Sequence, residues 1–134
     1  SAFSDQFPYL ITSWESLERL NKGLIKNRSQ VVKMDRFRPN IVVKGVEGLE
    51  KKTSHNFLCQ KSGYSFGLRK PCKRCKIITI NQEDGEIDNP KEPLSTLASL
   101  SFSDEINGAF FGQNAILLST KNYTLKVGDE FLIS

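Results

Sequence analysis

Short apolar runs separated by turn residues constrain the fold of this chain more than any other feature. Strand-like runs occur in FRPNIVVKG (37–45), YSFGL (64–68), KIITI (76–80) and AILLS (115–119). EDG follows KIITI as a turn signal, and Gly128-Asp129 favours a tight turn in a closing hairpin, YTLKVGDEFLI. Few segments have a helical pattern, so we expect a single mostly β domain over residues 1–134, a small β-barrel with a few short helices.

The helical segments are LITSWESLERLNKGL (10–24) and PLSTLASL (93–100). In the first, Thr12 and Glu15 match a capping box, and Gly23 marks the expected C-terminus. Its apolar face repeats at helical spacing and consists of Trp14, Leu17, Leu20 and Leu24. Residues 45–63 are expected to be mostly loop with one edge strand, residues 101–114 another loop, and residues 120–122 a turn.

Composition and charge exclude several function classes. No apolar run approaches the roughly 18 residues of a membrane span, and SAFSDQFPYL has no signal-peptide pattern. The net charge of +4 permits an anionic ligand such as a phosphate but does not require nucleic acid. Three cysteines, an odd number, argue against a secreted disulfide scaffold and favour a reducing cytoplasm. Because no methionine starts the chain, we expect a piece of a longer protein.

The stretch PCKRCK brings together residues that can carry chemistry. Its two cysteines lie among five basic residues, which are Arg69, Lys70, Lys73, Arg74 and Lys76. Neighbouring cations favour a thiolate over a thiol, and a thiolate is a good soft ligand for a heavy metal. One interpretation is therefore that Cys75, between Arg74 and Lys76, is a single reactive thiolate.

Three other interpretations of this stretch stay open. A structural zinc site would use the finger-like spacing H-x3-C-x12-C-x2-C of His55, Cys59, Cys72 and Cys75. A dithiol redox pair is another possibility, although such pairs usually precede a helix and a strand is expected here. The basic cluster, with aromatic residues nearby, could also bind nucleic acid or simply be a solvated loop.

Further polar residues suggest an anion or a planar ligand. Arg38 lies in FRPN, and its planar guanidinium suits a phosphate bidentately, or an ordinary salt bridge. Ser13 and Ser16, near the start of the first helix, could help to bind an anion or only cap the helix. In FFGQN, Gln113 and Asn114 could hydrogen-bond a planar heterocycle or belong to a well-packed turn.

Taken in order, several segments resemble the MOSC domain, the molybdenum-cofactor-sulfurase C-terminal domain, and especially the branch of the amidoxime-reducing component. These segments are FSDQFPYLITSWESLERLN, RFRPNIVV, KPCKRCKIITINQEDGEI, KEPLSTL, FGQNAIL and LKVGDEFLI. The resemblance implies a mostly β, barrel-like fold of the MOSC (pyruvate-kinase-barrel-like) type that holds a molybdenum pterin cofactor. It also implies a single MOSC domain from the C-terminal part of a longer protein, without the family's small β-rich N-terminal domain.

The resemblance also implies roles for particular residues. Cys75, in the second position of the C-x-x-C, matches the family's molybdenum ligand and catalytic centre, and Cys72 is its less essential neighbour. Arg38 and Asn40 match contacts to the cofactor and its phosphate. Ser13 resembles a further phosphate contact, and the cofactor-binding set is completed by Gln113 and Asn114.

The chemistry that the resemblance implies is two-electron reduction of N-hydroxylated compounds, such as amidoximes. Electrons would come from a separate iron–sulfur or haem partner, because the chain lacks the ligands for either group. Pyridoxal phosphate binding is a further association of the family. A sulfur-carrier role for Cys75 is the nearest enzymatic alternative. The rival from another class is a zinc-stabilised domain that presents its basic loop to nucleic acid.

Overall fold

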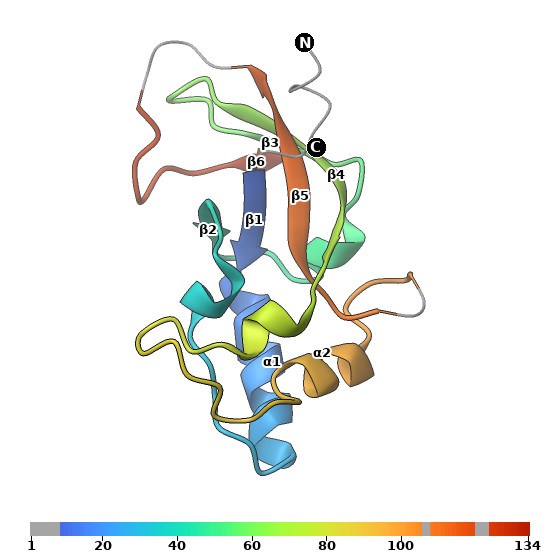
Figure 1. The fold of residues 1–134 in the computed structure, drawn as a ribbon. Helices are drawn as coiled ribbons and strands as arrows, with labels where there is room; N and C mark the ends of the chain where they lie inside the picture. Colours follow the sequence, from blue (N-terminus) through green and yellow to red (C-terminus); the bar gives the residue numbers. More distant parts are fainter. Residues whose placement is uncertain (1–8, 106–107, 120–123) are drawn as a thin grey trace.

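The computed structural model describes residues 9–105, 108–119 and 124–134, which form a curled sheet with helices at one end (Figure 1). The strands are β1 (Tyr9–Ser13), β2 (Ile41–Val43), β3 (Asn56–Leu58), β4 (Ser65–Lys73), β5 (Phe110–Ser119) and β6 (Leu132–Ile133). The helical elements are α1 (Trp14–Lys26), α2 (Leu94–Leu100) and the 3-10 turns η2 (Met34–Phe37), η3 (Leu49–Lys51) and η4 (Lys76–Thr79). The predicted mostly β class with a few short helices is confirmed.

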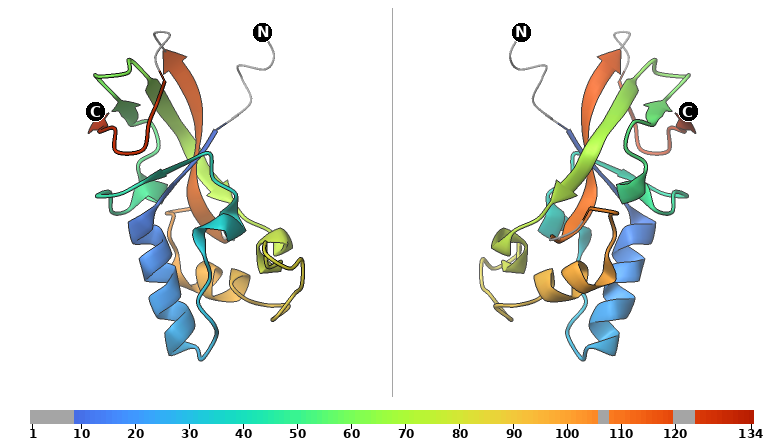
Figure 2. Two further views of the ribbon diagram at one scale, coloured as in Figure 1. Left: turned by 90° about the vertical axis from the view of Figure 1, so that its left-hand side faces the viewer. Right: turned by 90° about the vertical axis from the view of Figure 1, so that its right-hand side faces the viewer.

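The strands lie in the order β2-β1-β5-β4-β3-β6, and the sheet curls into a half-barrel with β2 and β6 at its edges (Figure 2). β4 and β5 form the long antiparallel centre, and β1 pairs antiparallel to β5 on the other side. β2 runs parallel to β1, with Ile11 opposite Ile41. A parallel pair needs a long crossover connection, and α1 and η2 provide it between these two strands.

Buried apolar side chains form two clusters. The cluster between the helices and the start of β5 consists of Leu17, Leu20, Leu24, Val32, Met34, Phe37, Ile78, Leu97, Phe102, Ala109 and Phe111. The cluster against the rest of the sheet consists of Ile11, Val46, Leu49, Phe57, Phe66, Leu68 and Ala115. The first cluster contains side chains of η2 and η4, so burial of apolar surface holds these turns against the helices and β5.

The ends of α1 differ from the prediction. Ser13 is the N-cap, and its Oγ accepts a hydrogen bond from the N–H of Ser16, so the capping box of Thr12 and Glu15 is wrong. The helix continues through Gly23 to Lys26. A Cβ at Gly23 would lie 3.0 Å from the side chain of Thr96 in α2, so this glycine allows the close packing of the helices.

Buried and exposed residues on α1 match its periodicity in part. Leu17, Leu20 and Leu24 are buried as predicted, whereas Trp14 is 44% exposed. α2 is confirmed: Leu97 is fully buried, and Leu94 and Leu100 pack partly buried against the same cluster.

Several strand predictions are corrected by tertiary pairing. KIITI forms the 3-10 turn η4 and not a strand. FFGQN, predicted as loop, is the start of β5, because β4 and β1 pair with it on both sides. β3 is not an edge strand, since it lies between β4 and β6. A turn forms at Lys126–Asp129, but β6 pairs with β3, and within residues 124–134 no hairpin forms across this turn. The predicted turn at residues 120–122 lies outside the described residues.

Candidate functional site

Two 3-10 turns lie side by side below the sheet and carry the residues with the strongest chemical signals (Figure 2). Arg38 follows η2 as its C-cap residue, in the left-handed backbone conformation with φ of 53°. Cys75 precedes η4 as its N-cap residue, with an extended backbone. Both residues are exposed, so a guanidinium and a thiol are available to a ligand at the ends of neighbouring turns.

Arginines join the two turns reciprocally. Nη2 of Arg74, the residue before Cys75, donates to the carbonyl of Phe37 at 3.0 Å, and Phe37 immediately precedes Arg38. Nη1 of Arg36 in η2 donates to the carbonyl of Ile78 in η4 at 3.2 Å, with a longer bond to the next carbonyl. Each arginine therefore binds a carbonyl of the other segment, so residues 36–37 and residues 74–79 are joined by hydrogen bonds.

The paired turns are attached to the central strand β5 and its approach. The ring of Phe37 is fully buried and stacks on that of Phe111, with centroids 3.8 Å apart. The N–H of Arg74 donates to the carbonyl of Ala109 at 2.7 Å. Since these contacts come from a packed core, the turns are held by the scaffold and do not depend on a ligand.

Exposed charges of both signs lie at the turns. Arg38 follows η2 and Lys76 begins η4, while Asp35 lies within η2. Exposed cations attract an anionic ligand. A sulfur ligand and a guanidinium are groups that suit a metal centre whose organic part has a phosphate.

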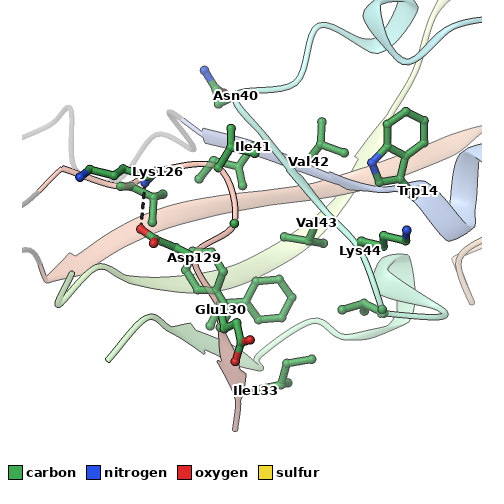
Figure 3. Close-up of a pocket in the computed structure, with 17 residues that line it drawn as sticks. Trp14, Asn40, Ile41, Val42, Val43, Lys44, Lys126, Asp129, Glu130 and Ile133 are labelled. Carbon is green, nitrogen blue, oxygen red and sulfur yellow. Dashed lines mark hydrogen bonds between the residues drawn. The ribbon is translucent and has the colours of Figure 1, made fainter. Parts of the chain in front are cut away.

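Asn40 connects this surface to a cleft at the edge of the sheet. Its Oδ1 accepts from the N–H of Leu10 at 2.7 Å, and its own N–H donates to the carbonyl of Leu10 at 2.9 Å. These bonds hold the start of β2 against β1. They engage the oxygen of the carboxamide, while the residue itself is exposed on the rim of the cleft (Figure 3).

The cleft has a volume of about 730 Å³ and separates β2 from the C-terminal segment. One wall consists of Trp14 and residues 40–46, and the other of residues 125–131 together with Phe57 and Ile133. Its lining combines aliphatic and aromatic side chains with Lys44 and Glu130, as Figure 3 shows.

Ser13 and Gln113 lie in the interior. Both are fully buried. The Oγ of Ser13 caps α1 and donates to the Oγ of Ser16 at 3.0 Å. Nε2 of Gln113 donates to the carbonyl of Glu50 and to Oγ1 of Thr53, at 3.2 and 3.1 Å, while its Oε1 has no hydrogen-bond partner within the described part of the chain. These side chains therefore support the fold around η3 in the structure.

Asn114 is half-buried in β5, where it stands opposite Leu10 of β1 and Lys70 of β4. The structure thus joins the residues next to Arg38 and Cys75 through the hydrogen bond from Arg74 to the carbonyl of Phe37. It places Asn114 on the sheet.

The sequence did not predict the buried carboxylate of Glu50, near the start of α1. Glu50 is 2% exposed, and its carboxylate accepts from Ser16 Oγ at 2.8 Å and from the N–H of Gly112 at 2.7 Å. Burial raises the pKa of Glu50, although these donors oppose the rise. Its contact with α1 is the hydroxyl of Ser16, in the first turn of that helix. No periodic or motif signal marks it, because GLEKK resembles a polar loop.

Arg36 was missed as well, and Arg74 was considered only as a member of the basic stretch around the cysteines. The hint in the sequence is that both are arginines and not lysines. The planar fork of arginine donates to two separate acceptors with fixed geometry, as Arg74 does to Phe37 and Cys72.

The predicted zinc site is wrong. Within residues 9–105, 108–119 and 124–134, no group of three or more His, Cys, Asp or Glu side chains could hold a metal ion. Cys59 is fully buried, whereas His55 and Cys75 are exposed, and all three cysteines are free thiols. A zinc-stabilised nucleic-acid-binding module therefore has no structural basis.

The part of the chain that the structure describes contains no helix with both the length and the apolar character required to cross a bilayer.

Comparison with known proteins gives a consistent family. The family model described as "MOSC domain" matches residues 1–131. Mitochondrial amidoxime-reducing component 1 of Mus musculus is 35% identical over 132 residues, which are 96% of this chain and 37% of that protein. The human protein of the same name is 32% identical over the same shares. Molybdenum cofactor sulfurase of Solanum lycopersicum is 32% identical over 144 residues, covering 97% of this chain and 17% of that protein.

Proposed function

The chain belongs to the MOSC domain family, and on this premise we propose that it binds a molybdenum pterin cofactor for the reduction of N-hydroxylated compounds. The observation that supports the proposal is the hydrogen-bonded pairing of η2 with the segment around η4, next to which Arg38 and Cys75 are both exposed. The amidoxime-reducing names of several relatives support the type of reaction.

The residues of the paired turns fit such a group. Cys75 would supply the sulfur ligand of the metal, because it is exposed at the start of η4. Arg38 would bind the phosphate of the cofactor with two parallel hydrogen bonds, since its guanidinium is exposed and its backbone is held by the turn. Asn40, whose oxygen is used by Leu10, would offer its amide N–H groups.

The remaining predicted residues would act at a greater distance. Ser13 and Gln113 would hold α1 and η3 in place behind the site, because their side chains are buried and hydrogen-bonded there. Asn114 lies on β5 and stays a prediction as a direct contact.

When bound, the cofactor would supply the two-electron chemistry for reducing an N-hydroxylated substrate such as an amidoxime. The protein would contribute the ligand Cys75, the position of the cofactor and a cationic environment. Electrons would come from a separate iron–sulfur or haem protein.

The chain spans about 37% of the length of the amidoxime-reducing relatives, so we propose that it acts as the MOSC domain of a longer protein. A small β-rich domain on its N-terminal side would provide further contacts to the cofactor. The cytoplasmic location stays a prediction based on cysteine usage, while the relatives carry the word "mitochondrial" in their names. Pyridoxal phosphate binding likewise stays a family-based prediction.

Elemental metal analysis tests the proposal. The full-length gene product, expressed in a host that makes the cofactor, should contain stoichiometric molybdenum, and Cys75→Ser should lose it. Cys72→Ser is the matched control and should keep it, because a serine hydroxyl still offers an acceptor to Arg74. Molybdenum in the wild type would justify assays of amidoxime reduction. A protein without molybdenum, or equal molybdenum in Cys75→Ser, would refute the proposed ligation.

A sulfur-carrier role is the second candidate, because the relatives include molybdenum cofactor sulfurases. In that role Cys75 would hold a persulfide sulfur and pass it to an acceptor. Cyanolysis, which releases thiocyanate from persulfides, distinguishes the two roles. Thiocyanate from the wild type but not from Cys75→Ser, without bound molybdenum, would favour the sulfur carrier.

A further inference from the structure

We propose that Arg74 is a positioning residue that sets the distance between Arg38 and Cys75, with the sulfur of Cys72 as its second acceptor. The inference rests on the proposed function, because it treats these two exposed residues as parts of one binding site. It assigns separate roles to the residues of the C-x-x-C stretch. Cys75 faces the ligand, whereas Cys72 and Arg74 hold the site together.

The guanidinium of Arg74 is fixed from three sides. Nη2 donates to the carbonyl of Phe37 at 3.0 Å, and Nη1 donates to Sγ of Cys72 at 3.3 Å. The guanidinium carbon also lies 5.6 Å from the centre of the Phe37 ring. Its backbone N–H is bonded to Ala109, so the whole residue is attached to the core. A side chain held in this way has little freedom to follow a ligand.

The position of Arg74 in the chain explains why its geometry matters. It precedes Cys75, and the carbonyl that it binds precedes Arg38. A shift of this single hydrogen bond therefore changes the separation of the proposed metal ligand and the proposed phosphate contact. Arg36 restrains the far end of η4 through Ile78, so the two turns are held at two points and cannot rotate freely past each other.

Cys72 has a role that does not require it to bind a metal. It is half-buried at the end of β4, and its sulfur accepts from Arg74. A hydrogen bond to sulfur keeps the guanidinium plane turned towards Phe37. An acceptor at this position is sufficient, so serine should replace Cys72 and valine should not.

Replacing Arg74 with lysine distinguishes an effect of side-chain geometry from an effect of charge. Lysine keeps the positive charge, but its ammonium is a single centre on a flexible stem and cannot span both acceptors with fixed geometry. If Arg74 acted only by attracting an anion, Arg74→Lys would be nearly neutral. Lys73→Gln is the matched control, because it removes a positive charge from an exposed neighbouring side chain that takes no part in the two side-chain hydrogen bonds of Arg74.

The first experiment needs no cofactor. Backbone amide NMR spectra of the chain, wild type and Arg74→Lys, should differ at residues 36–40 and 72–79, because both turns lose a shared restraint. Lys73→Gln should change only its immediate neighbours. Urea denaturation of each variant establishes that it is folded. Unchanged amide signals of Arg38 and Cys75 in a folded Arg74→Lys protein would overturn the inference, whatever the cofactor proves to be.

The second experiment measures cofactor retention in the full-length gene product. Removing a residue that orients a metal ligand typically lowers metal affinity about 10–100-fold, so Arg74→Lys and Cys72→Val should retain far less molybdenum than wild type after dialysis. Lys73→Gln and Cys72→Ser should retain it. A loss of molybdenum in Lys73→Gln together with full retention in Arg74→Lys would show that charge matters and not position, and would refute the inference. A wild type without molybdenum would refute the proposed function. The NMR experiment would then still test whether Arg74 positions Arg38 and Cys75.

Discussion

The buried carboxylate of Glu50 allows a quantitative test of how its hydrogen bonds affect the free energy of unfolding. It accepts from Ser16 Oγ at 2.8 and 3.0 Å and from the N–H of Gly112 at 2.7 Å, and the residue is 2% exposed. Glu50→Ala would leave the N–H of Gly112 buried without a partner. The hydroxyl of Ser16 would keep a partner, because Ser13 Oγ lies 3.0 Å away.

The expected cost of Glu50→Ala follows from these contacts. An orphaned buried N–H costs about 1–3 kcal/mol, and the lost methylene of the side chain adds about 0.8 kcal/mol. We therefore expect the free energy of unfolding to fall by about 2–4 kcal/mol. Glu50→Gln keeps an acceptor for Gly112 and gains a donor for Ser16, so its free energy of unfolding should stay within about 1 kcal/mol of the wild type.

The pH dependence gives the sign of the charge effect. Burial raises the pKa of Glu50 in the folded protein above its value in the unfolded chain. The unfolded chain therefore releases this proton at lower pH, and ionisation destabilises the fold. The favourable contribution of Glu50 is complete below the unfolded pKa and is lost as the pH rises through the raised folded pKa. Glu50→Gln should thus gain stability relative to wild type as the pH increases.

Urea denaturation at a series of pH values measures all three proteins. Glu47→Gln is the control, because the same chemical change three residues earlier affects an exposed side chain and should shift the free energy of unfolding by less than about 0.5 kcal/mol. The reasoning would be refuted if Glu50→Gln became less stable relative to wild type with increasing pH. That result would mean that the ionised carboxylate stabilises the fold.

Three further predictions concern a glycine, a helix cap and the contacts of Asn40. Gly112→Ala should lower the free energy of unfolding by at least about 1–3 kcal/mol, because φ is +83° and a Cβ would lie 2.8 Å from a β1 carbonyl. Gly85→Ala is the control: its φ is also positive but the space around it is open, so urea titration should show a smaller loss. Ser13→Ala should cost about 1 kcal/mol through loss of the α1 cap, and an unchanged melting curve would contradict that assignment. Asn40→Asp should keep its bond to Leu10 and its thermal stability but weaken phosphate binding, measured by calorimetry, whereas Asn40→Leu should lose both.

Local patterns in the sequence were sufficient for much of the fold. The spacing of Leu17, Leu20 and Leu24 predicts the buried face of α1, and the leucines of PLSTLASL predict α2. These predictions succeed because helical periodicity is a local property and each face meets a single apolar core.

Predictions failed where contacts between distant residues decide the structure. KIITI has the composition of a strand but forms η4, because the carbonyls of Ile78 and Thr79 are capped by Arg36 from another part of the chain. FFGQN has the composition of a turn but forms β5, because strands on both sides supply its hydrogen bonds. Propensity is a weak guide when the partners of the backbone lie far away in the sequence.

For the candidate site, the sequence by itself determined which chemical groups are present. These are the thiol of Cys75 between two cations, the guanidinium of Arg38 and the carboxamide of Asn40. Only the tertiary structure decided their arrangement, since Arg74 reaches a carbonyl 37 positions away and Glu50 meets an N–H 62 positions away. The physical reason is that residue type sets which charges and donors a chain possesses. Burial and long-range hydrogen bonds set which of them meet, and no local pattern records those partners.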